Sequence, residues 1–109
     1  MKVAVVWNGD KDSAVAYSNV KEKFDISFLL TFLHEKRSNA RFLSAIKRQS
    51  EKLGVPFFWA KVNTARPEDY RETMVELKED YGVEAIVTNG DQRLIEDACR
   101  AMGLKAIKA

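Results

Sequence analysis

The feature that most restricts the fold is a junction that occurs three times along the chain. Each copy places a glycine between an amphipathic segment and an apolar residue: Leu53-Gly54-Val55, Tyr81-Gly82-Val83 and Met102-Gly103-Leu104. Glycine readily adopts the left-handed conformation that commonly ends an α-helix, so each junction predicts an exit from a helix into a strand. Repeated exits of this kind indicate strands and helices in alternation, with right-handed crossovers.

The remaining pattern agrees with this alternation. Nearly continuous apolar runs predict strands at residues 2–7, 26–33, 55–62, 84–88 and 104–107, and Pro56 places the third strand at a sheet edge. Apolar residues at helical spacing predict helices over residues 13–20, 42–53, 67–81 and 89–102, the second of them capped by Ser38 or Asn39. Trp7, Trp59 and the pair Phe57-Phe58 are expected in the core, as are Tyr70 of the third predicted helix and Leu94 of the fourth. We therefore expect an α/β fold with one doubly wound five-stranded parallel sheet and helices on both of its faces.

Composition excludes several classes of protein. The 109 residues carry a net charge of only +2, which gives no strong attraction to nucleic acid or to an anionic membrane. No apolar run is long enough to span a bilayer, and the N-terminus does not resemble a signal peptide, so we expect a cytoplasmic location. The single cysteine, Cys99, excludes an intrachain disulfide. We interpret residues 1–109 as one domain.

The strongest functional signal is the segment Asn8-Gly-Asp-Lys-Asp-Ser13, which follows the first predicted strand and begins the first predicted helix. The first turn of a helix leaves backbone N–H groups without partners and carries partial positive charge, so phosphate is a natural ligand there. Lys11 adds a mobile positive charge, and the Ser13 hydroxyl can both donate and accept. A simple turn would not require Lys11, Asp12 and Ser13 together after a buried strand.

This segment resembles the Ser-Gly-Gly-x-Asp-Ser signature of the PP-loop ATP pyrophosphatases, also called N-type adenine nucleotide alpha hydrolases. Within that superfamily, the whole chain is most similar to the diphthine-ammonia ligase branch, in a short form. Asn8 stands at the position of the first serine and Asp10 at that of the second glycine. The resemblance implies a HUP-like, Rossmann-like sheet with strand order 3-2-1-4-5.

The resemblance also implies the ligands and their residues. ATP would be bound with Mg²⁺. Gly9, Lys11 and Ser13 would hold phosphate, with Asn8 also binding the nucleotide. The segment Leu30–Leu33, with Phe32 and Leu33, would line the base pocket. Asp12 would bind the magnesium, and Asp10 would either share it or repel the phosphates. Lys11 and Ser13 are the candidate catalytic residues.

A second Asn-Gly-Asp tripeptide follows the fourth predicted strand. In the implied strand order, the carboxyl ends of the first and fourth strands flank the switch point where such sheets bind ligands. We therefore interpret Asn8–Asp10 and Asn89–Asp91 as two walls of one crevice, with Asn89 and Gly90 binding the nucleotide. The alternative for the second tripeptide is an ordinary turn. His34 is interpreted as a surface or supporting residue, because no second histidine lies at metal-binding spacing.

Three functions stay open at this point. The first is ATP cleavage to AMP and pyrophosphate, which would activate an unknown acceptor in a ligase-type reaction. The second is a non-catalytic nucleotide-binding module like the universal stress proteins, and the third is a homo-oligomeric scaffold joined near the fifth strand. The resemblance implies that relatives continue into a further segment, so a homodimer or partner subunit would supply the missing half. RNA binding by the basic residues Lys36, Arg37, Arg41, Lys47 and Arg48 is a minority interpretation.

Overall fold

The computed structural model describes residues 1–34 and 40–109. Strands and helices alternate throughout these residues, as the glycine junctions predict. The elements are β1 Lys2–Val6, α1 Lys11–Val20, β2 Asp25–His34, α2 Ala40–Leu53, β3 Phe57–Val62, α3 Pro67–Tyr81, β4 Ala85–Thr88, α4 Arg93–Met102 and β5 Lys105–Lys108.

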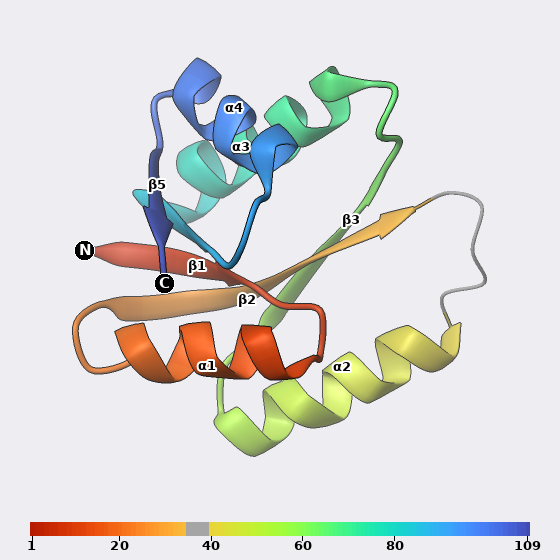
Figure 1. Ribbon diagram of the computed structural model, residues 1–109, viewed down its shortest axis with the longest axis vertical. Helices are drawn as coiled ribbons and strands as arrows, with labels where there is room; N and C mark the ends of the chain where they lie inside the picture. The colour runs from red at the N-terminus through yellow and green to blue at the C-terminus, as the bar shows by residue number, and fades with distance from the viewer. Residues whose placement is uncertain (35–39) are drawn as a thin grey trace.

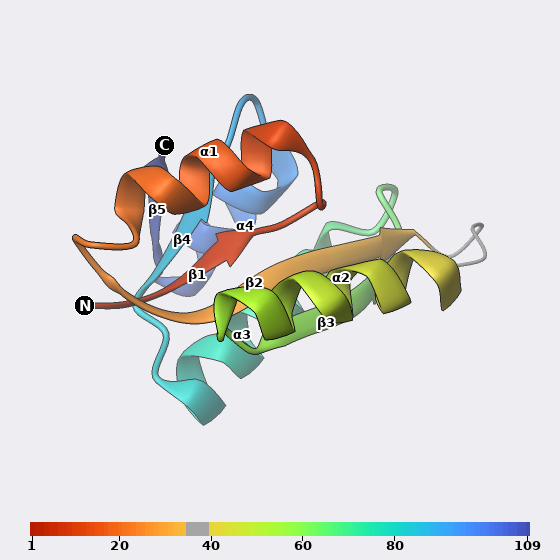
Figure 2. The same ribbon diagram turned by 90° about the horizontal axis from the view of Figure 1, so that it is seen from below.

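The strands form one five-stranded sheet in the order β3-β2-β1-β4-β5, and every neighbouring pair is parallel. This is the predicted α/β architecture and the predicted order. β1 lies at the centre, and β3 and β5 lie at the edges, which agrees with Pro56 immediately before β3. Figure 1 shows α1 and α2 on one side of the sheet and α3 and α4 on the other, and Figure 2 shows the same layers from below.

Alternate side chains of the central strands build the core on the two faces. Ala4, Val6 and Ile86 pack with residues of α3 and α4, whereas Val3 and Val5 pack toward α1. All five of these side chains are 0–1% exposed. Because both faces of β1 are buried, the strand needs its continuous apolar run and cannot shift in register without burying Lys2.

Glycine ends α2, α3 and α4, as the sequence predicts. Gly54, Gly82 and Gly103 have φ values of 69°, 70° and 76°, and the amides of Val83 and Leu104 bond back to carbonyl groups of α3 and α4. A left-handed residue followed by such a bond satisfies carbonyl groups that a helix end would leave free. The predicted cap of α2 at Ser38 or Asn39 lies outside the described residues.

Two predictions about the core were wrong. Trp59, expected in the core, is 45% exposed, because β3 is an edge strand and α2 does not fully cover it. Leu94, expected on the inner face of α4, is 37% exposed, and the buried face is formed by Ile95, Ala98 and Cys99. The described helices are all too short or too polar to cross a bilayer.

Candidate nucleotide-binding site

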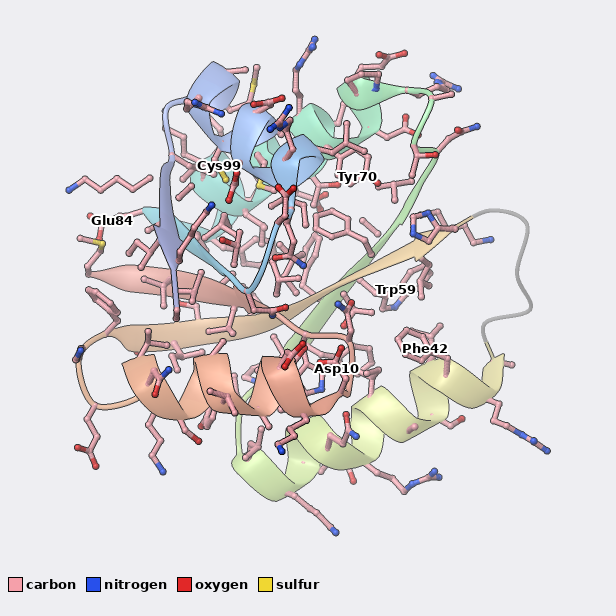
Figure 3. The ribbon with its side chains drawn as sticks, viewed as in Figure 1. Asp10, Phe42, Trp59, Tyr70, Glu84 and Cys99 are labelled. Atoms are coloured by element: carbon pink, nitrogen blue, oxygen red, sulfur yellow. The ribbon has the colours of Figure 1, made fainter. Side chains whose placement is uncertain are left out.

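The loop between β1 and α1 is closed by its own side chains. Asp10 is the N-cap of α1, and its Oδ1 accepts a hydrogen bond of 2.8 Å from the Ser13 amide. The Ser13 side chain is fully buried, and its Oγ accepts a hydrogen bond of 2.9 Å from the Asn8 amide. Figure 3 shows Asp10 at the beginning of α1. The predicted phosphate-binding residues therefore form a compact turn at the carboxyl end of β1.

This turn leaves two donors available at the start of α1. Lys11 and Asp12 are the first two helical residues, so their amides have no partner within the helix. Both side chains are exposed. The amide of Ser13, followed by its hydroxyl, lowers the pKa of Asp10, so this carboxylate is ionised at neutral pH. A phosphate at this position would meet two amides and Lys11, but also the charges of Asp10 and Asp12.

Residues of α2 and β2 hold the start of the loop. The Trp7 indole is 5% exposed, and its Nε1 donates a hydrogen bond of 2.7 Å to Oε1 of Gln49. The Trp7 carbonyl accepts a hydrogen bond of 2.9 Å from Thr31 Oγ1. Gly9 has a φ of 76°, and a Cβ atom there would lie 3.1 Å from Gln49 Oε1. Glycine is therefore required at position 9 both by conformation and by packing.

The loop after β4 reaches back to β1. Asn89 donates a weak hydrogen bond of 3.4 Å from Nδ2 to the Val6 carbonyl, and its amide donates to Oε1 of Gln92 at 3.0 Å. Asn89 thus joins the ends of β1 and β4, where the strand order reverses. α4 begins only at Arg93, not at the predicted Asn89–Asp91, because Gly90 has a left-handed φ of 65° and the N-cap residue Gln92 has non-helical angles, with φ −125° and ψ 62°.

A pocket of about 330 Å³ opens at the carboxyl ends of β1, β2 and β4. Two aromatic rings on its wall, Phe32 of β2 and Tyr70 of α3, pack with their centroids 5.1 Å apart. The pocket is also lined by the His34 imidazole, the Asp91 carboxylate and the Arg93 guanidinium. The full lining is Val6, Asn8, Phe32, His34, Tyr70, Asp91, Gln92, Arg93, Leu94 and Ile95.

The structure brings part of the predicted site together. One residue of each Asn-Gly-Asp tripeptide, Asn8 and Asp91, lines the pocket, and Phe32 joins them from β2. Leu33, expected at the base pocket, is 2% exposed and is not part of the pocket lining; neighbouring residues of a strand point to opposite faces. Gly90 and residues 9–13 also lie outside the lining. Residues 9–13 form the adjoining turn and the start of α1.

Sequence reasoning did not identify three residues of this region. Tyr70 was interpreted only as part of the α3 core stripe, and it does pack there, being 4% exposed. Arg93 and Gln92 carried no signal of their own, although their position after the second tripeptide could have suggested them. Figure 3 shows Tyr70 at the beginning of α3, on a different element from the loop residues.

Carboxylates for a metal ion are present in limited number. Among the described residues, no group of three His, Cys, Asp or Glu side chains is arranged around one point. Asp10 and Asp12 are both exposed at the start of α1. Mg²⁺ that is bound together with a nucleotide is usually held by one or two carboxylates, phosphate oxygens and water. Asp10 and Asp12 therefore suit an ion that arrives with a nucleotide, and not one that protein side chains alone would hold.

Comparison with solved structures gives the same fold. The chain is similar to the crystal structure of a protein described as a predicted subunit of tRNA methyltransferase from Methanocaldococcus jannaschii, with a TM-score of 0.60. The alignment covers 99% of this chain and 67% of that chain, at 14% sequence identity. No protein with a curated description matches significantly. The strand order and the loop after β1 thus define a doubly wound α/β domain.

The comparison with family models is more specific. The model described as "Diphthamide synthase N-terminal domain" matches residues 1–106. The chain therefore belongs to the diphthamide synthase N-terminal domain family, within the PP-loop superfamily.

Proposed function

We propose that this chain binds ATP as its magnesium complex, with the phosphates at the start of α1 and the base in the adjoining pocket. The observation that supports this most is the position of the pocket. It extends from Asn8, at the end of β1, to the loop after β4, which is the switch point of the sheet. Open parallel sheets bind nucleotides at such points.

The charges around the loop suit a triphosphate that carries its own cation. The amides of Lys11 and Asp12, the Lys11 ammonium group and the helix dipole attract the phosphates. Asp12 would hold hydrated Mg²⁺, which offsets its repulsion of the phosphates, whereas the Asp10 carboxylate is engaged in capping α1. The aromatic pair Phe32 and Tyr70 offers an apolar surface for the adenine.

We propose an adenylation reaction on this nucleotide, as the family membership supports. A carboxyl or carbonyl oxygen of an acceptor attacks the α-phosphorus, the bond to pyrophosphate breaks, and AMP is transferred to the acceptor. A nucleophile such as ammonia then displaces AMP. The contribution of this chain would be to orient the triphosphate and, through Lys11, to stabilise charge on the departing pyrophosphate.

One observation favours a second candidate function, a module that binds ATP without cleaving it. The Asp10 carboxylate occupies the Ser13 amide, which would otherwise be available to a phosphate. A site with fewer donors and an added negative charge stabilises a developing negative charge less well. The acceptor is unknown, and a homodimer or partner subunit could provide its binding site, since the matched archaeal protein is described as a subunit.

Incubation with Mg²⁺-ATP, followed by calorimetry and product analysis, tests the proposal. Formation of AMP and pyrophosphate supports adenylation, whereas bound but intact ATP supports the second candidate. Absence of binding at millimolar ATP would contradict both. Lys11→Met should abolish most of the binding, and Lys21→Met is the matched control, because Lys21 follows the opposite end of the same helix.

A further inference from the structure

We propose that Gln49 of α2 is a positioning residue for the phosphate-binding loop and that it acts through Trp7. The inference rests on the function proposed above for this loop. Gln49 lies outside the pocket lining, so it would affect ATP through the loop and not by contact with the base. It belongs to a different helix from the loop, which makes α2 part of the site.

Trp7 is the residue through which Gln49 would hold the phosphate-binding loop in place. It follows β1 and precedes Asn8, and both ends of its main chain are fixed to β2. Its amide donates to the Leu30 carbonyl at 2.8 Å, and its carbonyl accepts from Thr31 Oγ1 at 2.9 Å. The indole Nε1, with its 2.7 Å bond to Gln49, adds a third attachment. A buried indole N–H needs such a partner, so the bond fixes the ring in one orientation.

Gln49 also lies directly against Gly9. The same Oε1 atom would be 3.1 Å from a Cβ atom at position 9, and Nε2 would be 3.5 Å away. Gln49 therefore bonds to the residue before Asn8 and lies beside the space that a side chain at position 9 would occupy. Asn8 in turn donates its amide to Ser13 Oγ, so the support continues to the first turn of α1.

This arrangement would reduce the cost of binding. A loop held in its binding conformation loses less conformational freedom when the ligand arrives than a loop that must be ordered. Without the Gln49 oxygen, the Trp7 indole would lose its partner and the loop one of its fixed points. The unliganded loop would then sample conformations in which the Lys11 and Asp12 amides no longer converge.

Gln49→Met, Trp7→Phe and the double variant test the inference, with Arg48→Met as the matched control at an exposed position of the same helix. Gln49→Met keeps the side-chain length and removes the acceptor, whereas Trp7→Phe removes the donor. Each single variant should raise the Kd of Mg²⁺-ATP by about fivefold, the effect of one hydrogen bond. The double variant should bind no more weakly than the weaker single variant, because both remove the same bond.

Two readouts distinguish positioning from general stabilisation. In a Trp59→Phe background Trp7 is the sole tryptophan, and its emission should shift in Gln49→Met before nucleotide is added. Amide hydrogen exchange at Asn8 and Ser13 should accelerate in Gln49→Met and in Trp7→Phe, but not in Arg48→Met. Unchanged exchange at these two amides, or strictly additive losses of affinity, would overturn the inference. If the wild-type chain binds no nucleotide, the proposed function fails, and exchange in the free protein still decides whether Gln49 positions the loop.

Discussion

Asp10 serves the fold and limits the site at the same time. Its carboxylate caps α1 through the Ser13 amide, which satisfies one of the donors that a helix start leaves free. The same bond places a negative charge where a phosphate would approach. The sequence pattern identified position 10 as unusual. It could not decide whether the Asp10 side chain binds metal, repels phosphate or caps the helix, because that choice depends on the contacts of the side chain in the folded protein.

Asp10→Gly should therefore tighten binding of Mg²⁺-ATP. The variant releases the Ser13 amide and removes one charge, and we expect the Kd to fall by about threefold to tenfold. Glycine is a tolerable N-cap, so the free energy of unfolding should decrease by only a few tenths of a kcal/mol. Calorimetry and urea unfolding measure the two effects. Asp10→Asn, which keeps the cap and removes the charge, separates them; unchanged or weaker binding by Asp10→Gly would contradict a repulsive role.

The cap also gives a pH dependence with a defined sign. The pKa of Asp10 is lower in the folded protein than its ordinary value of 3.8, because the Ser13 amide bonds to the charged form. The stabilisation is therefore complete above the ordinary value and is lost as the pH falls through the lowered pKa. Urea unfolding at pH 7 and at about pH 2.5 should show the wild type losing stability relative to Asp10→Asn at the acidic pH. A constant difference between the two proteins would contradict this role.

Gly9 and Gly54 provide a matched pair of substitutions. Both have φ near +70°, but a Cβ atom at position 54 meets no atom within 4 Å, whereas one at position 9 meets Gln49 and Ile46. Gly54→Ala should cost about 1 kcal/mol of unfolding free energy from backbone strain. Gly9→Ala should cost more and should also weaken ATP binding. Equal costs in denaturant unfolding would show that contacts around Gly9 do not restrain the loop.

At the scale of elements, the sequence predicted the strands, their alternation with helices and the helix ends. These features depend on local chemistry: a glycine after an amphipathic segment can adopt the left-handed conformation that ends a helix, and a buried strand requires an apolar run. The predictions that were wrong concerned residues whose position depends on the elements packed around them. Trp59 is exposed because an edge strand is incompletely covered. α4 begins at Arg93 because the backbone of Gly90 and Gln92 is not helical.

The packing of α4 against α3 predicts how slowly the Cys99 thiol reacts in the folded protein. Cys99 is fully buried, with its Sγ 4.0 Å from Sδ of Met74. Burial, with a smaller contribution from Glu96, raises the pKa of Cys99 to about 12. We expect a thiol reagent at pH 8 to modify Cys99 only when α4 detaches or the protein unfolds, and rapidly in denaturant. Stoichiometric modification of the native protein within seconds would show that the two helices separate readily.

At the scale of the whole molecule, the strand order is what assembles the site. Because β1 and β4 are neighbours, two similar tripeptides from distant parts of the chain, at Asn8 and Asp91, line one pocket. The sequence predicted that convergence once the order was inferred from the resemblance. It could not predict that Tyr70 and Arg93 line the same pocket, since their positions depend on how α3 and α4 cross the sheet, and no local pattern encodes this.

The central claim is that the loop after β1 holds the phosphates of a nucleotide whose base lies in the adjoining pocket. The most direct test is a crystal structure with Mg²⁺ and a non-hydrolysable ATP analogue. We expect phosphate oxygens within hydrogen-bond distance of the Lys11 and Asp12 amides, with the adenine against Phe32 and Tyr70. A triphosphate bound elsewhere, or an empty loop at saturating analogue, would contradict the claim.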